Sequence, residues 1–321
     1  MKIIAVLLNP TIDVIYEISD FKVGETFKVE KKRIFPVGKG ISFSLAGRKL
    51  DKTIKLKVLA FIGRKDVNCY SEFLRSKKIN YEFIKIDGET RSNKTINDPI
   101  NNTTTHIREL GFILNQKKIQ KMKFLLKKEI KKGDICLFSG SIPPQTDENI
   151  YRELIQLSKE KGAICVLDSS GKALIKGIEA VPHIIKPNLK ELLQILESEN
   201  LQISASKEIS YDYRKIVKIT KPLLKKGLKI ILITLGARGA IMVTSTLIKI
   251  GKIEVQNVID TVGSGDSFLA GFLVKYCKGN SLENCFCFAL AAGAANTTKL
   301  GPGQFDTSKF YSLLDEVVLF P

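Results

Sequence analysis

The sequence predicts an α/β fold in which a mostly parallel sheet lies between two layers of helices, with a small antiparallel sheet beside it. Short apolar runs alternate with polar or amphipathic stretches of helical length over most of the 321 residues, a pattern typical of parallel strands joined by crossover helices. Two other regions alternate polar and apolar residues singly, as antiparallel strands do. The chain is 44% hydrophobic and 26% charged, so it can bury a core of the size that this fold needs.

The first strand of the parallel sheet is predicted in MKIIAVLLNP, where Asn9 and Pro10 end an apolar run. Five later runs, each followed or ended by Gly, Ser, Asp or Asn, are predicted as strands: 55–63, 134–140, 163–170, 183–188 and 229–236. Helices are predicted between several of these strands, over 71–79, 117–134, 147–161, 189–197 and 208–226. Because the carboxyl ends of parallel strands meet at one edge of a sheet, the polar strand endings should line one cleft.

The small sheet is predicted from two segments that are far apart in sequence, about 11–36 and 81–110. Both alternate polar and apolar residues, and turn signals lie at Asp87-Gly88 and at 97–102. We therefore expect a single domain over 1–321 with a β lid inserted from these segments. A lid keeps water away from a reaction in which hydrolysis must be avoided. A decorative edge sheet or a dimer contact is the alternative, and a dimer contact is compatible with a lid.

The composition limits the location and the partners of the protein. No run reaches the roughly 18 apolar residues of a membrane span, and the first apolar run is too short for a secretory leader, so we expect a cytoplasmic protein without membrane contact. The net charge is +18, which attracts phosphate backbones. The lysines are spread along the chain, however, and a solvated surface is favoured over a nucleic-acid surface.

The six cysteines do not form an obvious disulfide or metal pattern. They are few for the length, several lie beside apolar runs, and the chain has two histidines. Buried free thiols are therefore expected, and a zinc site is not.

The stretch DTVGSGDSF (260–268) carries the clearest chemical signal. The chain has no Walker A motif and no G-x-G-x-x-G, but here a glycine turn leads directly into an apolar helix. A helix amino terminus presents free N–H groups to an anion. Asp266 at this place could accept a proton from an attacking hydroxyl. From these residues alone, a helix-capping role for Asp266 remains the alternative.

The wider sequence resembles the PfkB (ribokinase-like) carbohydrate kinases, and NVIDTVGSGDSFLAGFL (257–273) resembles the carboxyl-terminal signature of that family. The resemblance covers nearly the whole chain and is strongest to the branch that phosphorylates hexose phosphates, which holds 1-phosphofructokinase and tagatose-6-phosphate kinase. The remaining motifs are LNPTIDVIY (8–16), VGKGIS (37–42), GETRSN (88–93), FSGSIP (138–143), LDSSG (167–171), IKPNLKEL (185–192) and ITLGARGA (233–240).

The resemblance implies a ribokinase-like three-layer α/β/α fold and assigns roles around the transferred phosphoryl group. Asp266 matches the catalytic base, and Gly263, Ser264 and Gly265 match the anion hole. Asp13 matches the acidic residue that binds the hydroxyl groups of the sugar. Lys39 and Arg91 match the residues that bind the phosphate already on the sugar, at the far end of the cleft. The other implied substrate-binding residues are Gly38, Gly40, Ser42, Asn93 and Ser139.

The nucleotide side of the site follows in the same way. Asn188 and Glu191 match the N-x-x-E element that is associated with Mg²⁺ and its water shell. Lys186 precedes this element, and Asn296 falls where the adenine pocket closes. The loop against the nucleotide is matched by Thr234, Gly236 and Gly239. ATP and Mg²⁺ are therefore the implied cosubstrate and ion.

Simpler roles compete with several of these assignments. Asp13 could form a turn, Arg91 could be a surface charge, and Asn188 with Glu191 could cap a helix. Ser42 stands where family members usually have Asn, so sugar contacts there could be weaker. Val37 replaces a usual Gly or Ala. Neither change removes a charge from the proposed mechanism.

The resemblance implies phosphorylation of fructose 1-phosphate to fructose 1,6-bisphosphate, with tagatose 6-phosphate as the alternative acceptor. A homodimer through the lid is also expected. A sugar-phosphate sensor or a nucleic-acid binder on the same fold is the non-enzymatic alternative. The presence together of Asp13, Lys39, Arg91 and Asp266 favours the kinase, since a sensor does not need a proton acceptor.

Overall fold

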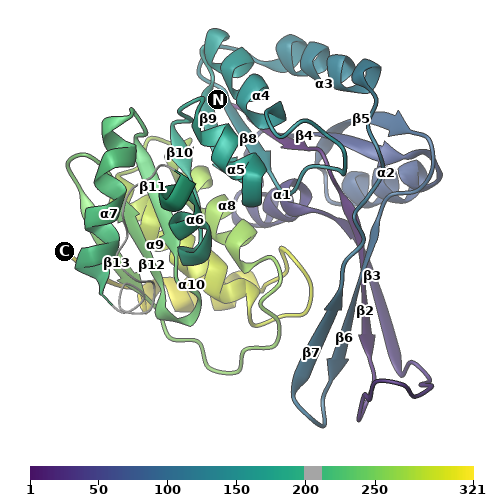
Figure 1. Cartoon of the computed structure of the whole chain (residues 1–321). Coiled ribbons are helices and arrows are strands. Elements are labelled where there is room, and N and C mark those ends of the chain that lie inside the picture. Colours follow the sequence, from purple (N-terminus) through teal and green to yellow (C-terminus); the bar gives the residue numbers. More distant parts are fainter. Residues whose placement is uncertain (199–211) are drawn as a thin grey trace.

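The computed structural model describes residues 1–198 and 212–321 and has three layers (Figure 1). The middle layer is a ten-stranded sheet in the order β14-β13-β12-β11-β10-β9-β8-β1-β4-β5. Strands β5 to β11 of this order are parallel to one another, and β12, β13 and β14 pair antiparallel at one end. The mostly parallel sheet is thus confirmed. Its strands are β1 (Ile3–Leu7), β4 (Leu56–Gly63), β5 (Asn80–Ile86), β8 (Ile135–Ser139), β9 (Ile164–Asp168), β10 (Ile184–Ile185), β11 (Ile230–Thr234), β12 (Ala240–Val243), β13 (Ile248–Lys252) and β14 (Val318–Phe320).

The two sides of the sheet bury separate apolar cores, because side chains alternate along each strand. In β1, Ile3, Ala5 and Leu7 belong to one core, and Ile4 and Val6 belong to the other. The first core packs against α1 (Lys39–Leu50), α2 (Val67–Ser76), α8 (Ser264–Tyr276), α9 (Leu282–Asn296) and α10 (Thr307–Asp315). The second packs against α3 (Gln116–Glu129), α4 (Ile150–Glu160), α5 (Gly171–Ile178), α6 (Leu189–Ser198) and α7 (Tyr213–Lys225). Residues 208–211 of the helix predicted over 208–226 lie outside the described residues.

Four strands form a small sheet that projects from the body of the molecule, where the lid is predicted (Figure 1). They are β2 (Thr11–Glu17), β3 (Lys31–Val37), β6 (Ser92–Asp98) and β7 (Thr103–Ile107), in the order β3-β2-β6-β7. The two outer pairs are antiparallel as predicted, but β2 and β6 pair in parallel, so the small sheet is mixed. A parallel centre arises because each insertion supplies one hairpin and the two hairpins join side by side.

The predicted boundaries of the lid need two corrections. Residues 81–86 belong to β5, which pairs in parallel with β4 in the main sheet. Residues 25–30 form no strand, and β3 begins at Lys31. The turn at 99–102 does join β6 to β7, and the carboxylate of Asp98 holds it by accepting from the amides of Ile100 and Asn101.

The six cysteines are free thiols. Cys136, Cys165 and Cys285 are buried as expected, whereas Cys69 is exposed on α2. Among the described residues, no helix is long and apolar enough to cross a membrane.

Candidate active site

The glycine turn before α8 has the geometry that an anion site requires. Gly263 is the N-cap residue of α8 and lies in the left-handed region with φ 80°. A Cβ atom there would come within 2.6 Å of the Cα of Pro302, so only glycine fits without a shift of the backbone. The carboxylate of Asp260 accepts from the amides of Val262 and Gly301. The turn is therefore held in place from both sides.

Not every amide of this turn is free to bind an anion. The amide of Ser264 donates to the carbonyl of Thr261 at 3.2 Å, which corrects the expectation that all the amides of the turn point at the ligand. The amides of Gly265 and Asp266 have no acceptor among the described residues. These two N–H groups lie in the first turn of α8, where the helix dipole also favours an anion.

Asn296, predicted at the nucleotide pocket, packs behind the glycine turn. It is fully buried at the end of α9 and donates to the carbonyl of Val262 at 2.8 Å. Its amide oxygen accepts from the hydroxyl of Ser267 and from the amide of Gly303. Asn296 therefore ties the glycine turn to the rest of the molecule, and no part of it is exposed to contact a base.

Asp266 projects from the first turn of α8 and has an unusual acidity. Burial raises the pKa of Asp266 to about 7. The nearby ammonium groups of Lys39 and Lys186 oppose the rise in its pKa, while the carboxylate of Asp168 adds to it. A carboxyl group with a pKa near neutrality is well matched to accept and release a proton.

Three further charges meet beside Asp266 at the carboxyl ends of the strands. Asp168, the last residue of β9, is 1% exposed and accepts from two lysines. The Nζ of Lys39 lies 2.9 Å from its Oδ1, and the Nζ of Lys186 lies 3.2 Å from the same atom. Burial alone would raise the pKa of Asp168, but Lys186 and Lys39 outweigh it and lower the pKa. Asp168 is therefore the ionised partner that holds both lysines.

Asp168 was not predicted as a site residue, although it lies in the motif LDSSG (167–171). Its signal was available: an acid at the end of a fully buried strand lies at the edge where ligands bind. Lys186 follows β10 and places its Nζ 3.3 Å from where a Cβ of Gly265 would stand. This ammonium group therefore lies over the glycine turn, where a second cation would neutralise a phosphate.

Lys39 is the first residue of α1, and the charges of Asp168 and Asp266 both act on it. Burial alone would lower the pKa of Lys39, but the carboxylates of Asp168 and Asp266 raise it above its ordinary value. The lysine thus belongs to the charge cluster around the glycine turn and not to a separate far end of the cleft. Gly38 caps α1 with φ 127°, and a Cβ there would lie 3.1 Å from the Cα of Pro10.

The lid contributes a second polar group. Asp13 on β2 and Asn93 on β6 are register partners, and the amide of Asn93 donates to Asp13 Oδ1 at 3.1 Å. Thr11 donates to the same oxygen at 3.1 Å. Burial raises the pKa of Asp13, and these hydrogen bonds only partly offset it. The Oδ1 atom of Asn93 is buried without a partner in the described structure, which leaves an acceptor for a hydroxyl.

Arg91 is held to the backbone at the base of the lid. Its guanidinium donates to the carbonyls of Asn9, Pro10 and Glu109. The positive charges of Arg91 and of Arg108 both act on Asp13. Arg108 is exposed and was not among the predicted residues; it follows β7, so only the folded lid brings it near Asp13.

Gly40, Ser42 and Ser139 are the remaining residues predicted to bind the substrate. A Cβ on Gly40 would stand 3.1 Å from the Oγ of Ser139, so glycine keeps this contact open. The hydroxyl of Ser139 is buried with no partner in the part of the chain that the structure describes. Ser42 is buried in α1 and donates to the carbonyl of Gly38, so its hydroxyl serves its own helix and does not join the site.

The predicted metal element is a capping box at the start of α6. The amide of Asn188 donates to Glu191 Oε2, and the amide of Glu191 donates to Asn188 Oδ1, both at 2.8 Å. Glu191 is partly exposed, and its negative charge acts on Lys39. Its other carboxylate oxygen fits the preference of Mg²⁺ for oxygen ligands. No group of three or more acidic, His or Cys side chains is gathered for a metal within the described residues, so most ligands would be phosphate oxygens and water.

The loop after β11 completes the edge. Thr234 ends β11 and is bridged to Asn188. Gly236 and Gly239 have φ values of 63° and 92°, and a Cβ on Gly239 would lie 2.0 Å from the carbonyl oxygen of Gly251. The turn itself therefore requires glycine at position 239, whereas at Gly236 only the positive φ favours it.

A buried carboxyl group with a raised pKa, free helix amides and two lysines paired with Asp168 lie together at the edge of a parallel sheet, an arrangement that suits the handling of phosphoryl groups. Residues 7–308 match the model of the pfkB family of carbohydrate kinases. The chain belongs to this family, and it is a phosphotransferase that acts on a carbohydrate.

The similar proteins of known name are kinases of hexose phosphates. The chain is 28% identical to 1-phosphofructokinase of Bacillus subtilis, with 94% of this chain and 95% of that one covered. It is 30% identical to 1-phosphofructokinase of Borreliella burgdorferi, with 94% of each chain covered. Tagatose-6-phosphate kinase of Staphylococcus epidermidis is 26% identical over 98% of each chain.

Solved structures confirm the fold. Phosphofructokinase-2 of Escherichia coli matches 98% of each chain with a TM-score of 0.88 and 22% identity. Ribokinase of Thermotoga maritima matches with a TM-score of 0.75 and 20% identity, covering 98% of this chain and 100% of that one. The ribokinase-like fold is therefore shown.

Proposed function

We propose that this kinase transfers the γ-phosphoryl group of ATP to fructose 1-phosphate and produces fructose 1,6-bisphosphate. The observation that carries the proposal is Asp266, a carboxyl group with a pKa of about 7 beside the free amides of the α8 amino terminus. The 1-phosphofructokinase relatives support this acceptor. Tagatose 6-phosphate is the second candidate, because a relative of similar identity has the name of that kinase.

In the proposed reaction Asp266 accepts the proton of the attacking sugar hydroxyl. The hydroxyl oxygen forms a bond to the γ-phosphorus, while the bond from that phosphorus to the bridging oxygen breaks and ADP leaves with the electron pair. The amides of Gly265 and Asp266 would stabilise the charge on the transferred group. Lys186, which lies over Gly265, would neutralise it further.

The sugar would bind between the lid and the sheet edge. Asp13 and the unpaired oxygen of Asn93 suit sugar hydroxyls, one through its carboxyl group and one as an amide acceptor. Arg91 and Arg108 supply the positive charge near Asp13 that a sugar phosphate requires. Lys39 would bridge the two phosphates, since its ammonium belongs to the cluster around Asp266.

Glu191 and the loop at 234–239 would hold the nucleotide end. A Mg²⁺ ion bound there with the nucleotide would neutralise phosphate charge. Glu191 is oriented for this by its bond from the amide of Asn188.

A coupled assay of ADP release tests this function. The wild-type enzyme is assayed with fructose 1-phosphate, tagatose 6-phosphate, fructose 6-phosphate and ribose. We expect the largest kcat/KM for fructose 1-phosphate. A larger value for tagatose 6-phosphate would overturn the acceptor and keep the mechanism, whereas no turnover with any of the four would overturn both.

A homodimer through the lid is proposed on separate grounds. All five residues of the edge strand β7 are exposed, and Ile34 on β3 and Ile107 on β7 are 51% and 53% exposed. Apolar side chains on a projecting sheet suit contact with a second copy. We expect the dimer mass by light scattering for the wild type and the monomer mass for Ile34→Asp/Ile107→Asp. The control Phe124→Asp changes an exposed apolar residue on α3; a monomeric wild type would contradict the proposal.

A further inference from the structure

A large groove lies at the edge of the main sheet opposite the candidate active site. Its volume is about 960 Å³, and its wall includes Lys2 before β1, Leu56 at the start of β4 and Asn80 at the start of β5. These are the amino ends of the parallel strands, whereas Asp168 and Ser139 end strands at the other edge. With β1 and β4 five and eight residues long, the two edges are roughly 15–25 Å apart.

The lining of this groove is strongly positive. The groove is lined by six cationic side chains and a single carboxylate, that of Glu129. The cations come from separate parts of the sequence and are gathered only by the fold: Lys2, Arg48, Lys55, Lys57, Arg75 and Lys78. A concave surface with one sign of charge concentrates ligands of the opposite sign.

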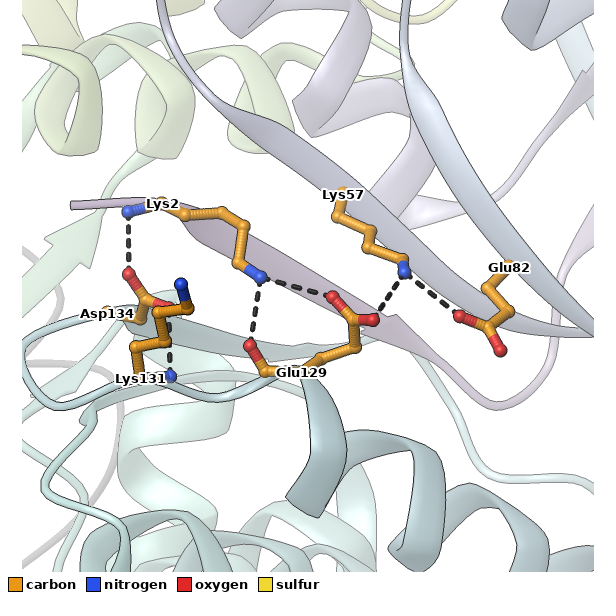
Figure 2. A network of polar contacts seen from close by, with 6 residues as sticks. All are labelled: Lys2, Lys57, Glu82, Glu129, Lys131 and Asp134. Atoms are coloured by element: carbon orange, nitrogen blue, oxygen red, sulfur yellow. Dashed lines mark hydrogen bonds and ion pairs between the residues drawn. The ribbon is translucent and has the colours of Figure 1, made fainter.

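Two of the six cations are already neutralised, as Figure 2 shows. The Nζ of Lys57 lies 2.7 Å from Glu129 Oε1 and 2.9 Å from Glu82 Oε2. The Nζ of Lys2 lies 3.1 Å from Glu129 Oε2. The amide of Lys2 donates to Asp134. This network braces the ends of β1 and β4 and does not need a ligand.

The other four cations have no carboxylate partner among the described residues. Lys55, Arg75 and Lys78 are exposed. Arg48, in the last turn of α1, donates through one Nη to the carbonyl of Lys52, but its buried Nε–H has no acceptor in the described structure. A guanidinium held in this way on the wall of a groove has donors left for an anion.

We propose that this groove binds a small organic molecule that carries two or more phosphate groups. One phosphate would leave most of the four free cations unpaired, because they come from α1, from the segment before β4 and from the end of α2. The volume is at the upper end of the roughly 300–1,000 Å³ typical of small-molecule sites. Tyr81 also lines the groove and gives it an apolar wall for the organic part.

The placement of α1 connects this groove to the candidate active site. Lys39 is its first residue, and Arg48 lies in its last turn. A ligand on Arg48 therefore contacts the same helix that presents Lys39 to Asp168. The ligand is either a nucleoside triphosphate or a sugar bisphosphate, which share two or more phosphate groups on a small organic molecule.

Isothermal titration of the full chain tests the site, with tripolyphosphate as the probe and ATP and fructose 1,6-bisphosphate as two further arms. The groove variant Lys55→Gln/Arg75→Gln removes two exposed free cations. The matched control Lys117→Gln/Lys121→Gln removes two exposed charges from α3. A third variant, Lys186→Gln, weakens binding at the candidate active site. All variants are first compared with the wild type by circular dichroism.

We expect the groove variant to bind tripolyphosphate at least about tenfold more weakly at one site, with that site retained in Lys117→Gln/Lys121→Gln and in Lys186→Gln. Of ATP and fructose 1,6-bisphosphate, the compound whose binding to the same site is lost in the groove variant identifies the class of ligand. Equal loss in the α3 control would show general charge attraction and overturn the proposal. Full retention in the groove variant, or displacement of the probe by a short duplex DNA at equal phosphate concentration, would also overturn it.

Discussion

Two ends of one sheet carry interleaved lysines and carboxylates, and they differ in what burial does to the acids. At the carboxyl ends, burial raises the pKa of Asp266 to about 7 although Lys39 and Lys186 oppose it. At the amino ends, burial also acts on Glu129, but Lys57 and Lys2 outweigh it and lower its pKa. The same residue types therefore produce a carboxyl group with a raised pKa at one end and one with a lowered pKa at the other.

The difference comes from how the lysines are shared. Asp168 binds Lys39 and Lys186 directly, so Asp266 has their charge nearby and forms no ion pair of its own within residues 1–198 and 212–321. Glu129 instead binds two lysines, one through each oxygen. A carboxyl group in a cationic site thus stays available as a base when a second carboxylate occupies the cations.

The largest effect that would test this comparison is the loss of the base. Asp266→Asn keeps the shape of the side chain and removes its proton acceptor, so we expect kcat to fall by about 10²–10⁴-fold. The measurement is steady-state ADP release with fructose 1-phosphate. Asp315→Asn, an exposed acid on α10, is the control. Undiminished turnover of Asp266→Asn would remove Asp266 from the mechanism.

The same variant should have an opposite effect on stability. Because folding raises the pKa of Asp266, the native state resists ionisation of this group and is relatively more stable at low pH. That stability is lost as the pH rises through about 7. We expect the Tm of Asp266→Asn to exceed that of the wild type at pH 8, with the difference shrinking as the pH falls from 7 towards 4.

The second prediction concerns Asp168. Asp168→Asn leaves Lys39 and Lys186 without their shared partner, and Lys186 is 5% exposed. We expect a loss of about 3 kcal/mol in the free energy of unfolding, because an uncompensated buried charge is costly. Urea denaturation at pH 7 measures it. A loss below about 1 kcal/mol would mean that Asp266 pairs with the lysines in place of Asp168. That result would contradict the proposal that Asp168 alone neutralises them.

The third prediction is the pH dependence of the reaction. Asp266 accepts a proton only when it is ionised, so kcat/KM should fall about tenfold per pH unit below its pKa of about 7. The profile is measured from pH 5.5 to 8.5 at constant ionic strength. The residual activity of Asp266→Asn should lack this limb. A wild-type profile that is flat through pH 7 would contradict the raised pKa.

Much of the fold could be predicted from the sequence, and the exceptions have physical causes. Strands such as β8 and β9 are buried on both faces and read as continuous apolar runs. β5 is the edge strand of the main sheet. Exposed and buried residues follow one another at its end, so it has the same alternation as the lid strands and was assigned to them.

The site was predicted less completely, because its partners are distant in sequence. GSGD and its helix were readable locally, and so was the capping pair Asn188 and Glu191. The pairing of Lys39 with Asp168 joins residues 129 positions apart. The contacts of Asn296 with Val262 and Gly303 could not be predicted from the sequence, because they depend on two loops meeting in the fold. The spread lysines gave no sign that six cations line one groove.

The smallest predicted effect is a loss of stability at the ion-pair network of Glu129, at the amino ends of the strands. It tests the second half of the comparison between the two ends of the sheet. Glu129→Gln removes an acid from two lysines whose side chains are 23% and 17% exposed. Because water still reaches these pairs, we expect a loss of only about 1 kcal/mol in the free energy of unfolding at pH 7.

The lowered pKa of Glu129 makes this stability present above the pKa of the unfolded chain and lost as the pH falls below it. The difference from the wild type should therefore vanish once the pH lies below the lowered pKa of Glu129 in the folded protein. Glu153→Gln, which breaks a single more exposed pair with Lys123, should lose less than Glu129→Gln in the same urea titration. A loss as large as that of Asp168→Asn would show that the two ends of the sheet hold their charges equally tightly.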